Sequence, residues 1–456
     1  MKSAQKYRTP ILIFGTSPDY VKRISAKYEN DVLFIMDKNF QENDYIKDVD
    51  KGSLFFTDLD DFEKQIGSVV RYLFSKNIQP SGIACFDCES LINASRLAVK
   101  LDLPFPPVDG ISKTRNKQQS KGIWEDHNID CPKASIARNL KETMSFFQKL
   151  DNPVVVKPVS SSGSELTFYC RDKKQVADAV GIITQQLANR NSNPFFKKLP
   201  HEKGAKPVDP LTHWVVEEFI PGKEYSCDFI FREGEISVIR LTEKIRDYEQ
   251  TFGSIMAYCI PANFPDGFSR KGFISTLKKA VSSLEITYGW FMADFIVNGN
   301  TPYILEITPR PGGDSIPDLI ETATGKDILG MYLDFMSGRI KDIQPIEYNS
   351  KSLVSLNIYS PGPGIITELD FSSIETLPWV KKIYILRKIG DRIILPPLNY
   401  DNRTIGHAII ISSNRYDLKE KQRFLLGKIK LNLKEHEENP FIENKTEISI
   451  PCHHTA

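Results

Sequence analysis

Asp294 and Glu306 are carboxylates embedded in two apolar runs of the sequence, residues 291–297 and 302–307. The runs flank Asn-Gly-Asn, and an Asn-Gly pair between apolar runs is typical of a β-hairpin. A turn centred on Asn300 places the two carboxylates opposite each other on one face. Like charges in that arrangement repel, so we expect a cation between them. Mg²⁺ is the natural candidate, because it prefers oxygen ligands and binds through one or two carboxylates together with substrate phosphates.

The segment that follows the second run adds groups that can bind an anion. Arg310 can hold a carboxylate or a phosphate in a planar, two-pronged contact. Gly312 and Gly313 allow backbone N–H groups to approach an anion closely. A metal-binding strand that leads into an anion-binding loop suits phosphoryl transfer. The alternative is that Asp294 and Glu306 form a solvated or lysine-paired acid pair at a sheet edge.

Two lysines could serve the same chemistry. Lys157 ends a short apolar strand, residues 153–157, and a loop of small residues follows that can fold N–H and hydroxyl groups over phosphates. The residues of this loop are Ser160, Ser161, Ser162, Gly163 and Ser164. The loop is not a Walker A loop, because its spacing differs and a strand follows it. The segment Thr114-Arg115-Asn116-Lys117 opens a helix, and Lys117 can reach a phosphate from outside the loop. The alternatives are a plain hairpin turn and a surface lysine.

Residues 214–226 predict a strand, a turn and the start of another strand. Adenine needs a backbone donor and acceptor between apolar walls, and residues 216–220 can supply them. Ribose needs a carboxylate that accepts hydrogen bonds from its hydroxyl groups, and Glu224 can be that carboxylate. The alternative is an ordinary Pro-Gly hairpin with solvated acids.

The elements that must position these residues predict an α/β fold. Two apolar runs, residues 11–14 and 32–36, are separated by a helix-like stretch, which indicates a parallel α/β unit. Another apolar run, residues 82–86, precedes a helical pattern that the proline-rich residues 104–107 end. Further predicted elements are strands at 353–358 and 409–411 and a basic helix at 416–434.

The composition of the 456-residue chain indicates an ordinary globular protein with several domains. Hydrophobic residues make up 41% and charged residues 26%, and the formal net charge is +1. No strong field therefore favours nucleic acid or a membrane as a partner. No apolar run reaches the roughly 18 residues that a membrane helix needs.

Cysteine and histidine residues do not indicate a metal centre. The 7 cysteines have no framework spacing, which indicates reduced thiols in a cytoplasmic protein. Cys85 and Cys88 form one C-x-x-C without the second pair that a zinc site needs. The histidines show no close ligand spacing, and we expect them to be non-catalytic. They occupy positions 127, 201, 213, 407, 436, 453 and 454.

Taken in order, these pieces resemble the ATP-grasp superfamily, of the carboxylate–amine (amino-acid) ligase type. The family order is a lysine at a helix, a strand with a lysine and a small-residue loop, an acid-rich hinge with Gly-x-Glu, and an acid hairpin ending in E-x-N-x-R-x-G-G. The corresponding segments here are RNKQQ, VVVKPVSSSGS, VVEEFIPGKEYS and ADFIVNGNTPYILEITPRPGG. Residues 387–411 also resemble the C-terminal domain of amino-acid ligases in this family.

The resemblance covers the whole chain and implies an ATP-grasp fold with three domains. Residues 1–110 would form a parallel pre-ATP-grasp α/β domain. Residues 111–345 would form the nucleotide-binding and catalytic ATP-grasp domain, with a lid at about 155–220. Residues 346–456 would form a C-terminal α+β domain.

The resemblance also implies roles for particular residues. The implied nucleotide-binding residues are Lys117, Lys157, Ser160, Ser161, Ser162, Gly163, Ser164, Glu217, Glu218, Phe219, Ile220 and Glu224. Within this set the two lysines and the serine loop would contact the ATP phosphates. Glu217, Phe219 and Ile220 would hold adenine, and Glu224 would bind ribose. The implied ligands of Mg²⁺, with Mn²⁺ as an alternative ion, are Asp294, Glu306 and Thr308. The implied catalytic residues are Lys157 and Arg310, and Lys244 is a weaker candidate for a phosphate contact.

The implied reaction joins a carboxylate, from an amino acid or a small acid, to an amine through an acyl phosphate, and releases ADP and phosphate. Thr308 departs from the family pattern, which usually has Asn there, and this departure puts a second metal ion in question. Alternatives are carboxylation or thioester formation on the same scaffold, or an ATP-binding protein that has lost catalysis. The expected partners are small molecules, with neither nucleic acid nor a membrane, and a homodimer is one option.

Overall fold

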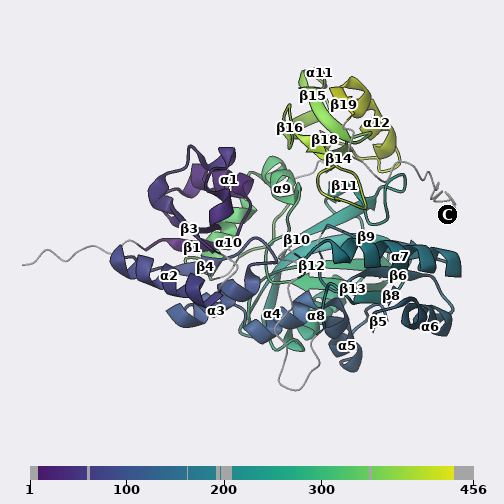
Figure 1. Ribbon diagram of the computed structural model, residues 1–456, viewed down its shortest axis with the longest axis horizontal. Coiled ribbons are helices and arrows are strands. Elements are labelled where there is room, and N and C mark those ends of the chain that lie inside the picture. Colours follow the sequence, from purple (N-terminus) through teal and green to yellow (C-terminus); the bar gives the residue numbers. More distant parts are fainter. Residues whose placement is uncertain are drawn as a thin grey trace, which may run out of the picture.

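The computed structural model describes residues 9–58, 62–161, 163–191, 196, 208–341, 343–348 and 352–435. Its N-terminal part is a parallel sheet with helices on both faces, as the sequence predicts (Figure 1). The elements of this part are β1 (Ile11–Phe14), α1 (Pro18–Tyr28), β2 (Val32–Asp37), β3 (Leu54–Thr57), α2 (Phe62–Ser75), β4 (Gly82–Ala84), α3 (Leu91–Leu101) and α4 (Val108–Arg115).

Both faces of this N-terminal sheet are buried, which explains its continuous apolar runs. The strands lie in the order β3-β2-β1-β4 and pair in parallel. Ile11 and Ile13 pack in one apolar cluster with α1, α9 and α10 (the last two bounded below), whereas Leu12 and Phe14 pack in another with α2 and α3. One-turn 3₁₀ helices at Lys38–Phe40, Asp44–Ile46 and Lys51–Ser53 connect β2 to β3.

A small antiparallel sheet follows, with strands in the order β5-β8-β6-β7. The elements here are α5 (Lys117–Asp126), β5 (Ala134–Ala137), α6 (Leu140–Leu150), β6 (Val154–Pro158), β7 (Phe168–Cys170), α7 (Lys173–Ala188) and β8 (Trp214–Glu218). Side chains of Asn116, Asn139 and Asp172 accept hydrogen bonds from the first free N–H groups of α5, α6 and α7, which sets where these helices begin. The α7 helix packs against β6 and β8 in one apolar cluster.

The largest sheet is antiparallel, with strands in the order β13-β12-β9-β10-β11-β14-β18-β16. Its strands and associated helices are β9 (Lys223–Arg232), β10 (Glu235–Arg246), β11 (Ile255–Ile260), α8 (Arg270–Ser282), β12 (Tyr288–Asn298), β13 (Thr301–Thr308), α9 (Ile316–Thr324), α10 (Ile328–Met336), β14 (Leu353–Tyr359), β16 (Val380–Ile385) and β18 (Thr404–Ile411). We call it the central sheet. β11 pairs with β14, so strands from both sides of the predicted boundary near residue 346 share this sheet.

The remaining C-terminal elements form a small sheet in the order β17-β15-β19. They are β15 (Gly364–Asp370), α11 (Ser372–Glu375), β17 (Arg392–Ile393), α12 (Leu418–Lys428) and β19 (Lys430–Lys434). The prediction of one helix over 416–434 is wrong, because the helix ends at Lys428. The alternating segment Lys430–Lys434 pairs as a strand with β15 instead. The α/β fold class is confirmed, and the domain boundaries stay predictions.

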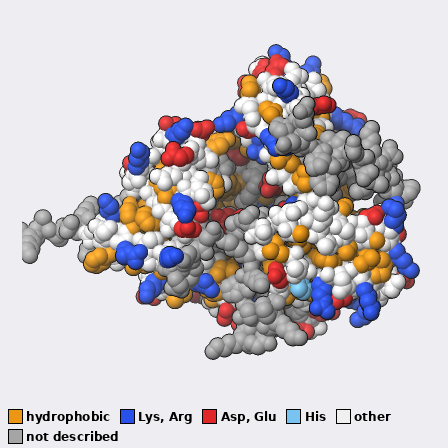
Figure 2. All heavy atoms as spheres, viewed as in Figure 1, with side chains coloured by type: hydrophobic (Ala, Val, Ile, Leu, Met, Phe, Trp, Pro, Cys, Tyr) orange, Lys and Arg blue, Asp and Glu red, His pale blue; other side chains and the backbone are white. Residues whose placement is uncertain are grey.

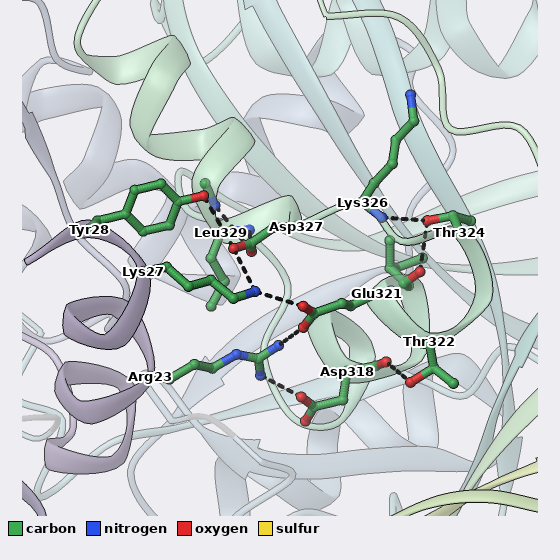
Figure 3. A network of polar contacts seen from close by, with 12 residues as sticks. Arg23, Lys27, Tyr28, Asp318, Glu321, Thr322, Thr324, Lys326, Asp327 and Leu329 are labelled. Atoms are coloured by element: carbon green, nitrogen blue, oxygen red, sulfur yellow. Dashed lines mark hydrogen bonds and ion pairs between the residues drawn. The ribbon is translucent and has the colours of Figure 1, made fainter.

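Charged side chains tie the N-terminal part to the segment that follows the candidate metal hairpin. Figure 3 shows α1 side chains pointing toward α9 and the start of α10. Arg23 contacts Asp318 at 2.6 Å, and Lys27 contacts Glu321 at 2.6 Å and Asp327 at 3.0 Å. The space-filling view shows a hollow between this part, at the left, and the C-terminal elements at the top (Figure 2). Among the described residues, no helix is long and apolar enough to cross a membrane.

Candidate active site

The β12–β13 hairpin places Asp294 directly opposite Glu306, as the sequence predicts. The predicted turn centre is wrong. Asn298 pairs with Thr301, so the turn is centred between Gly299 and Asn300 instead of on Asn300. The error cancels because β13 contains a one-residue bulge at Leu305, which shifts the register between the turn and the acids.

Lysines surround this acid pair. Lys244 donates a hydrogen bond to Asp294 at 2.9 Å, and Lys117 Nζ lies 3.9 Å from Glu306 Oε2. Burial alone would raise the pKa of Glu306, but Lys117 and Lys157 outweigh it and lower that pKa. Burial raises the pKa of Asp294 despite Lys244, and the charge of Glu306 adds to the rise. The pair is therefore both desolvated and paired with cations.

Lys117 is the first residue of α5, and it is buried rather than on the surface. Thr114 and Arg115, which the sequence places in the same helix, end α4 instead. The Lys117 ammonium donates to the backbone oxygen of Ser161 at 2.8 Å, so it links the serine loop to Glu306. Its burial and position leave the interpretation as a surface lysine without support.

Lys157 and Lys121 share one buried acid, Glu217. Glu217 lies 2.7 Å from Lys157 Nζ and 2.8 Å from Lys121 Nζ. Burial would raise the pKa of Glu217, but Lys121 and Lys157 together hold it below its usual value. Sequence reasoning missed Lys121. The available signal was its spacing of four residues from Lys117, which puts both lysines on one helical face.

The serine loop connects β6 to β7, which do pair as a hairpin. Its ends are held from outside: Arg115 donates to Ser160 Oγ at 3.3 Å, and Ser164 donates to the backbone oxygen of Gly253 at 3.1 Å. Gly163 has a φ of +60° and leaves room for the carboxylate of Asp401. Ser162 lies outside the described residues.

The linker after β8 joins two different sheets, so the Pro-Gly hairpin alternative is wrong. The N–H of Phe219 donates to the backbone oxygen of Pro153 at 3.0 Å, which leaves it unable to serve a nucleotide. Within the described part of the chain, the N–H of the buried Ile220 has no backbone acceptor. The Glu218 carboxylate accepts a long hydrogen bond from Lys133 N at 3.4 Å. Of these two N–H groups, that of Ile220 is therefore the one available to a ligand.

Aromatic side chains and a charged carboxylate flank this linker. The Phe219 ring lies 4.7 Å from that of Tyr169 and 6.3 Å from that of Phe252, centroid to centroid. These rings supply an apolar wall of the kind that a base needs. Glu224 contacts Lys244 at 2.6 Å and Arg246 at 2.8 Å. Burial opposes ionisation of Glu224, but the two cations lower its pKa to about 2.

Arg310 and the glycines after it form a loop anchored from below. Arg310 donates from Nε to Cys88 Sγ at 3.0 Å and from a terminal nitrogen to the backbone oxygen of Pro311 at 2.7 Å. The N–H of Gly312 donates to Asp228 at 3.0 Å. Asp228 in turn holds the fully buried Arg240 at 2.9 Å. Sequence reasoning did not identify Cys88, Asp228 or Arg240 as neighbours of this loop, because they come from distant elements.

The acid pair fits Mg²⁺ on the chemistry of its oxygen donors. Thr308 lies two residues after Glu306 on the same strand, so its hydroxyl shares the face of Glu306. Among the described residues, no group of three or more His, Cys, Asp and Glu side chains converges as a metal cage. Mg²⁺ needs no such cage where substrate phosphates and water complete its ligands.

Three of the histidines lie within the described ranges, and their contacts are with residues other than Asp294 and Glu306. His407 is buried and lies 3.3 Å from Asp318. His127 and His213 contact backbone oxygens of Ile123 and Asp209. Histidines 201, 436, 453 and 454 lie outside the described residues.

The chain is similar to known proteins in sequence and in fold. A family model described as the ATP-grasp domain matches residues 150–318. The structure superposes on an L-amino acid ligase from Bacillus licheniformis with a TM-score of 0.71 and 17% sequence identity, covering 94% of this chain and 100% of the other. Residues 150–318 of this chain therefore match an ATP-grasp domain, and the chain shares its fold with the L-amino acid ligase.

Two relatives illustrate how far the sequence likeness reaches. A D-alanine–D-alanine ligase from Acidovorax ebreus is 24% identical over 240 residues, which are 49% of this chain and 64% of the relative. Protein y4rH from Sinorhizobium fredii is 19% identical over 321 residues, which are 70% of this chain and 61% of the relative. The chain therefore spans just under two thirds of the length of these curated relatives.

Proposed function

We propose that this protein is an ATP-dependent carboxylate–amine ligase that works through an acyl phosphate. The observation that carries the proposal is the facing pair of Asp294 and Glu306 with lysines around it. Two facing carboxylates can bind a divalent cation, and the lysines around them can bind a polyphosphate. Mg-ATP is a ligand that supplies both groups. The likeness to D-alanine–D-alanine ligase and L-amino acid ligase supports a ligase among ATP-grasp activities.

The proposed nucleotide site lies between the β5-β8-β6-β7 sheet and the central sheet. Lys117 and Lys157 would neutralise the phosphates, and the serine loop would cover them. The N–H of Ile220 would donate a hydrogen bond to adenine. Glu224 would accept hydrogen bonds from the ribose hydroxyl groups while it retains its ion pair with Lys244. Asp294, Glu306 and Thr308 would hold Mg²⁺ or Mn²⁺, which would supply positive charge to the phosphate oxygens in the transition state.

In the first proposed step, a carboxylate oxygen of the substrate attacks the γ-phosphorus of ATP. The bond from that phosphorus to the β,γ-bridging oxygen breaks, and ADP leaves with the bonding electron pair. Arg310 would hold the substrate carboxylate in line, and Lys157 would neutralise charge on the transferring group. Catalysis of this step is positioning and electrostatic stabilisation.

In the second proposed step, an amine nitrogen attacks the acyl carbon of the acyl phosphate. The bond from carbon to the phosphate oxygen breaks, phosphate leaves, and the nitrogen loses a proton as the amide forms. The N–H of Gly312 is already held by Asp228, so Arg310 is the cation proposed to stay with the acyl phosphate. A closed serine loop would exclude water from this intermediate.

The proposed substrates are an amino acid or small acid and an amine, both small molecules. A homodimer is a further proposal. A cytoplasmic location is likewise proposed, and the free thiols among the described cysteines support it.

A phosphate-release screen over pairs of amino acids, small acids and amines tests the proposal. We expect release only when ATP, a divalent ion, a carboxylate and an amine are all present. Glu306→Ala should lose at least about 100-fold in turnover while its thermal midpoint stays close to wild type. Glu235→Ala, at a carboxylate whose side chain is 86% exposed, is the control and should keep full activity.

Full activity in Glu306→Ala would remove the metal assignment. Tight ATP binding without phosphate release under any substrate pair would instead identify an ATP-binding protein that has lost catalysis.

A further inference from the structure

The bulge at Leu305 decides which face of the hairpin Glu306 occupies. From the turn, Asn298 pairs with Thr301 and Phe295 pairs with Ile304, and after the bulge Asp294 pairs with Glu306. Without the extra residue, Leu305 would stand opposite Asp294. Glu306 would then turn to the other face of the sheet, because a one-residue slip exchanges the faces of a strand.

That other face is fully apolar. Phe295 and Ile304 pack there, together with Ala293 and Ile307, in the cluster under α8. A carboxylate placed among these side chains would be far from Asp294 and costly to bury. The facing acid pair therefore depends on the bulge and does not follow from the turn alone.

The extra residue of a bulge leaves backbone groups without a partner in the ladder. Here the backbone oxygen of Leu305 accepts a hydrogen bond from Lys121 Nζ at 2.8 Å. Lys121 comes from α5, and its side chain is only 1% exposed. Because β13 is the edge strand of the central sheet, its outward-facing groups are open to such a contact.

The same ammonium is paired with the acid that holds Lys157. Lys121 Nζ lies 2.8 Å from one oxygen of Glu217, and Lys157 Nζ lies 2.7 Å from the other. Lys121 therefore contacts both the bulge beside Glu306 and Glu217, the carboxylate on β8 that pairs with Lys157. Burying a lysine costs a large desolvation free energy unless its ammonium group is fully paired. The two contacts of Lys121 therefore indicate a structural role for this buried charge.

We propose that Lys121 is a positioning residue that holds the Leu305 bulge, and so keeps Glu306 on the face of Asp294 and in register with Lys157. The inference rests on the proposed function, because it assigns the acid pair to a divalent ion. Lys121 itself is not proposed to touch nucleotide, metal or substrate. Its effect passes through the backbone of Leu305 and the carboxylate of Glu217.

The inference can be tested without turnover by measuring the affinity for Mn²⁺ in the presence of ADP. Electron paramagnetic resonance reports the concentration of free Mn²⁺. Lys121→Met removes the donor and the charge at nearly constant volume. We expect it to weaken Mn²⁺ binding by about tenfold or more, as loss of a residue that orients a metal ligand does. Lys113→Met is the matched control, since Lys113 is also buried but pairs with Glu285, and it should leave Mn²⁺ affinity unchanged.

Kinetics separate positioning from general stability. Lys121→Met should lower kcat and raise the Mg²⁺ concentration for half-maximal rate, with a smaller change in the KM for ATP. Lys121→Arg keeps a donor and a charge, so it should recover Mn²⁺ affinity to within about threefold of wild type. If Lys121→Met does not fold, Lys121→Arg decides alone: a folded Lys121→Arg that has lost Mn²⁺ binding overturns the inference.

The outcomes distinguish this inference from the proposed function. Unchanged Mn²⁺ affinity in folded Lys121→Met, with Glu306→Ala strongly impaired, overturns the role of Lys121 and leaves the ligase proposal standing. Unchanged Mn²⁺ affinity in Glu306→Ala overturns both, because the acid pair would then not hold the ion.

Discussion

At the scale of single residues, the site acids differ in how their charge is compensated. Glu217, Glu224 and Glu306 are each surrounded by cations that lower their pKa against the effect of burial. Glu89 is different, because burial and the neighbouring charge of Asp87 raise its pKa to about 7. It lies in the loop before α3, close enough to Arg310 to feel its charge.

Glu89→Gln should change how stability depends on pH. The folded protein keeps a proton on Glu89 up to about pH 7, whereas the ordinary value is 4.5. Stability from this group is therefore full below the ordinary value and is lost as the pH rises through 7. Glutamine cannot lose a proton, so the variant should have a higher thermal midpoint than wild type at about pH 8, and the difference should shrink at about pH 5. Scanning fluorimetry at both values measures it, and an equal difference at both would contradict the assignment.

At the scale of elements, glycines occupy two opposite kinds of position. Gly312 is needed, because a Cβ there would collide with the guanidinium of Arg240. Gly181 is different: it lies in the middle of α7, is exposed, and a Cβ added to it would meet no atom within 4 Å. A helical glycine with free space around it lowers stability through backbone entropy alone.

Gly181→Ala should therefore stabilise the protein by about 0.5–1 kcal/mol without affecting activity. Gly312→Ala is the counterpart and should lower both stability and phosphate release, since Arg240 and Asp228 must move. Urea unfolding followed by circular dichroism measures the first effect. A destabilised Gly181→Ala would mean that α7 has a neighbour at this position in solution.

At the scale of the whole molecule, one carboxylate joins three parts of the chain. Asp318 of α9 contacts Arg23 of α1 at 2.6 Å and His407 of β18 at 3.3 Å (Figure 3 shows the first contact). The α9 helix begins just after the Arg310 loop. The N-terminal part and β18 therefore both bear on the element that follows the candidate site.

Asp318→Asn should cost about 2 kcal/mol of stability, because it removes the charge that a half-buried arginine is paired with. Arg23 would keep its longer contact of 3.3 Å to Glu321, so the protein should still fold. Lys278→Ala, in an exposed pair with Glu235, is the control and should cost less than about 1 kcal/mol. Thermal midpoints of the three proteins compare the effects, and equal losses in both variants would contradict a junction at Asp318.

Part of the site could be predicted because its signals are local. Strand alternation and an Asn-Gly pair predicted the hairpin, but the placement of Asp294 opposite Glu306 is right only because the wrong turn centre and the unpredicted bulge at Leu305 cancel. The helix at Lys117 was predicted, but its start was placed too early, at Thr114, because the Asn116 side chain that caps α5 was not recognised. The prediction of one helix over 416–434 is wrong because local composition favours a helix throughout. Pairing with β15, which is distant in sequence, makes the end of this segment a strand.

By itself the sequence determined the kinds of chemistry available: the acids, lysines and glycines, their order, and the period of the strands that carry them. Only the tertiary structure decided that Leu305 forms a bulge, that Lys121 holds it, and that Glu217 is shared between two lysines. The physical reason is that a buried charge or an unpaired carbonyl is stabilised by partners from other elements, and no local pattern states which partners those will be.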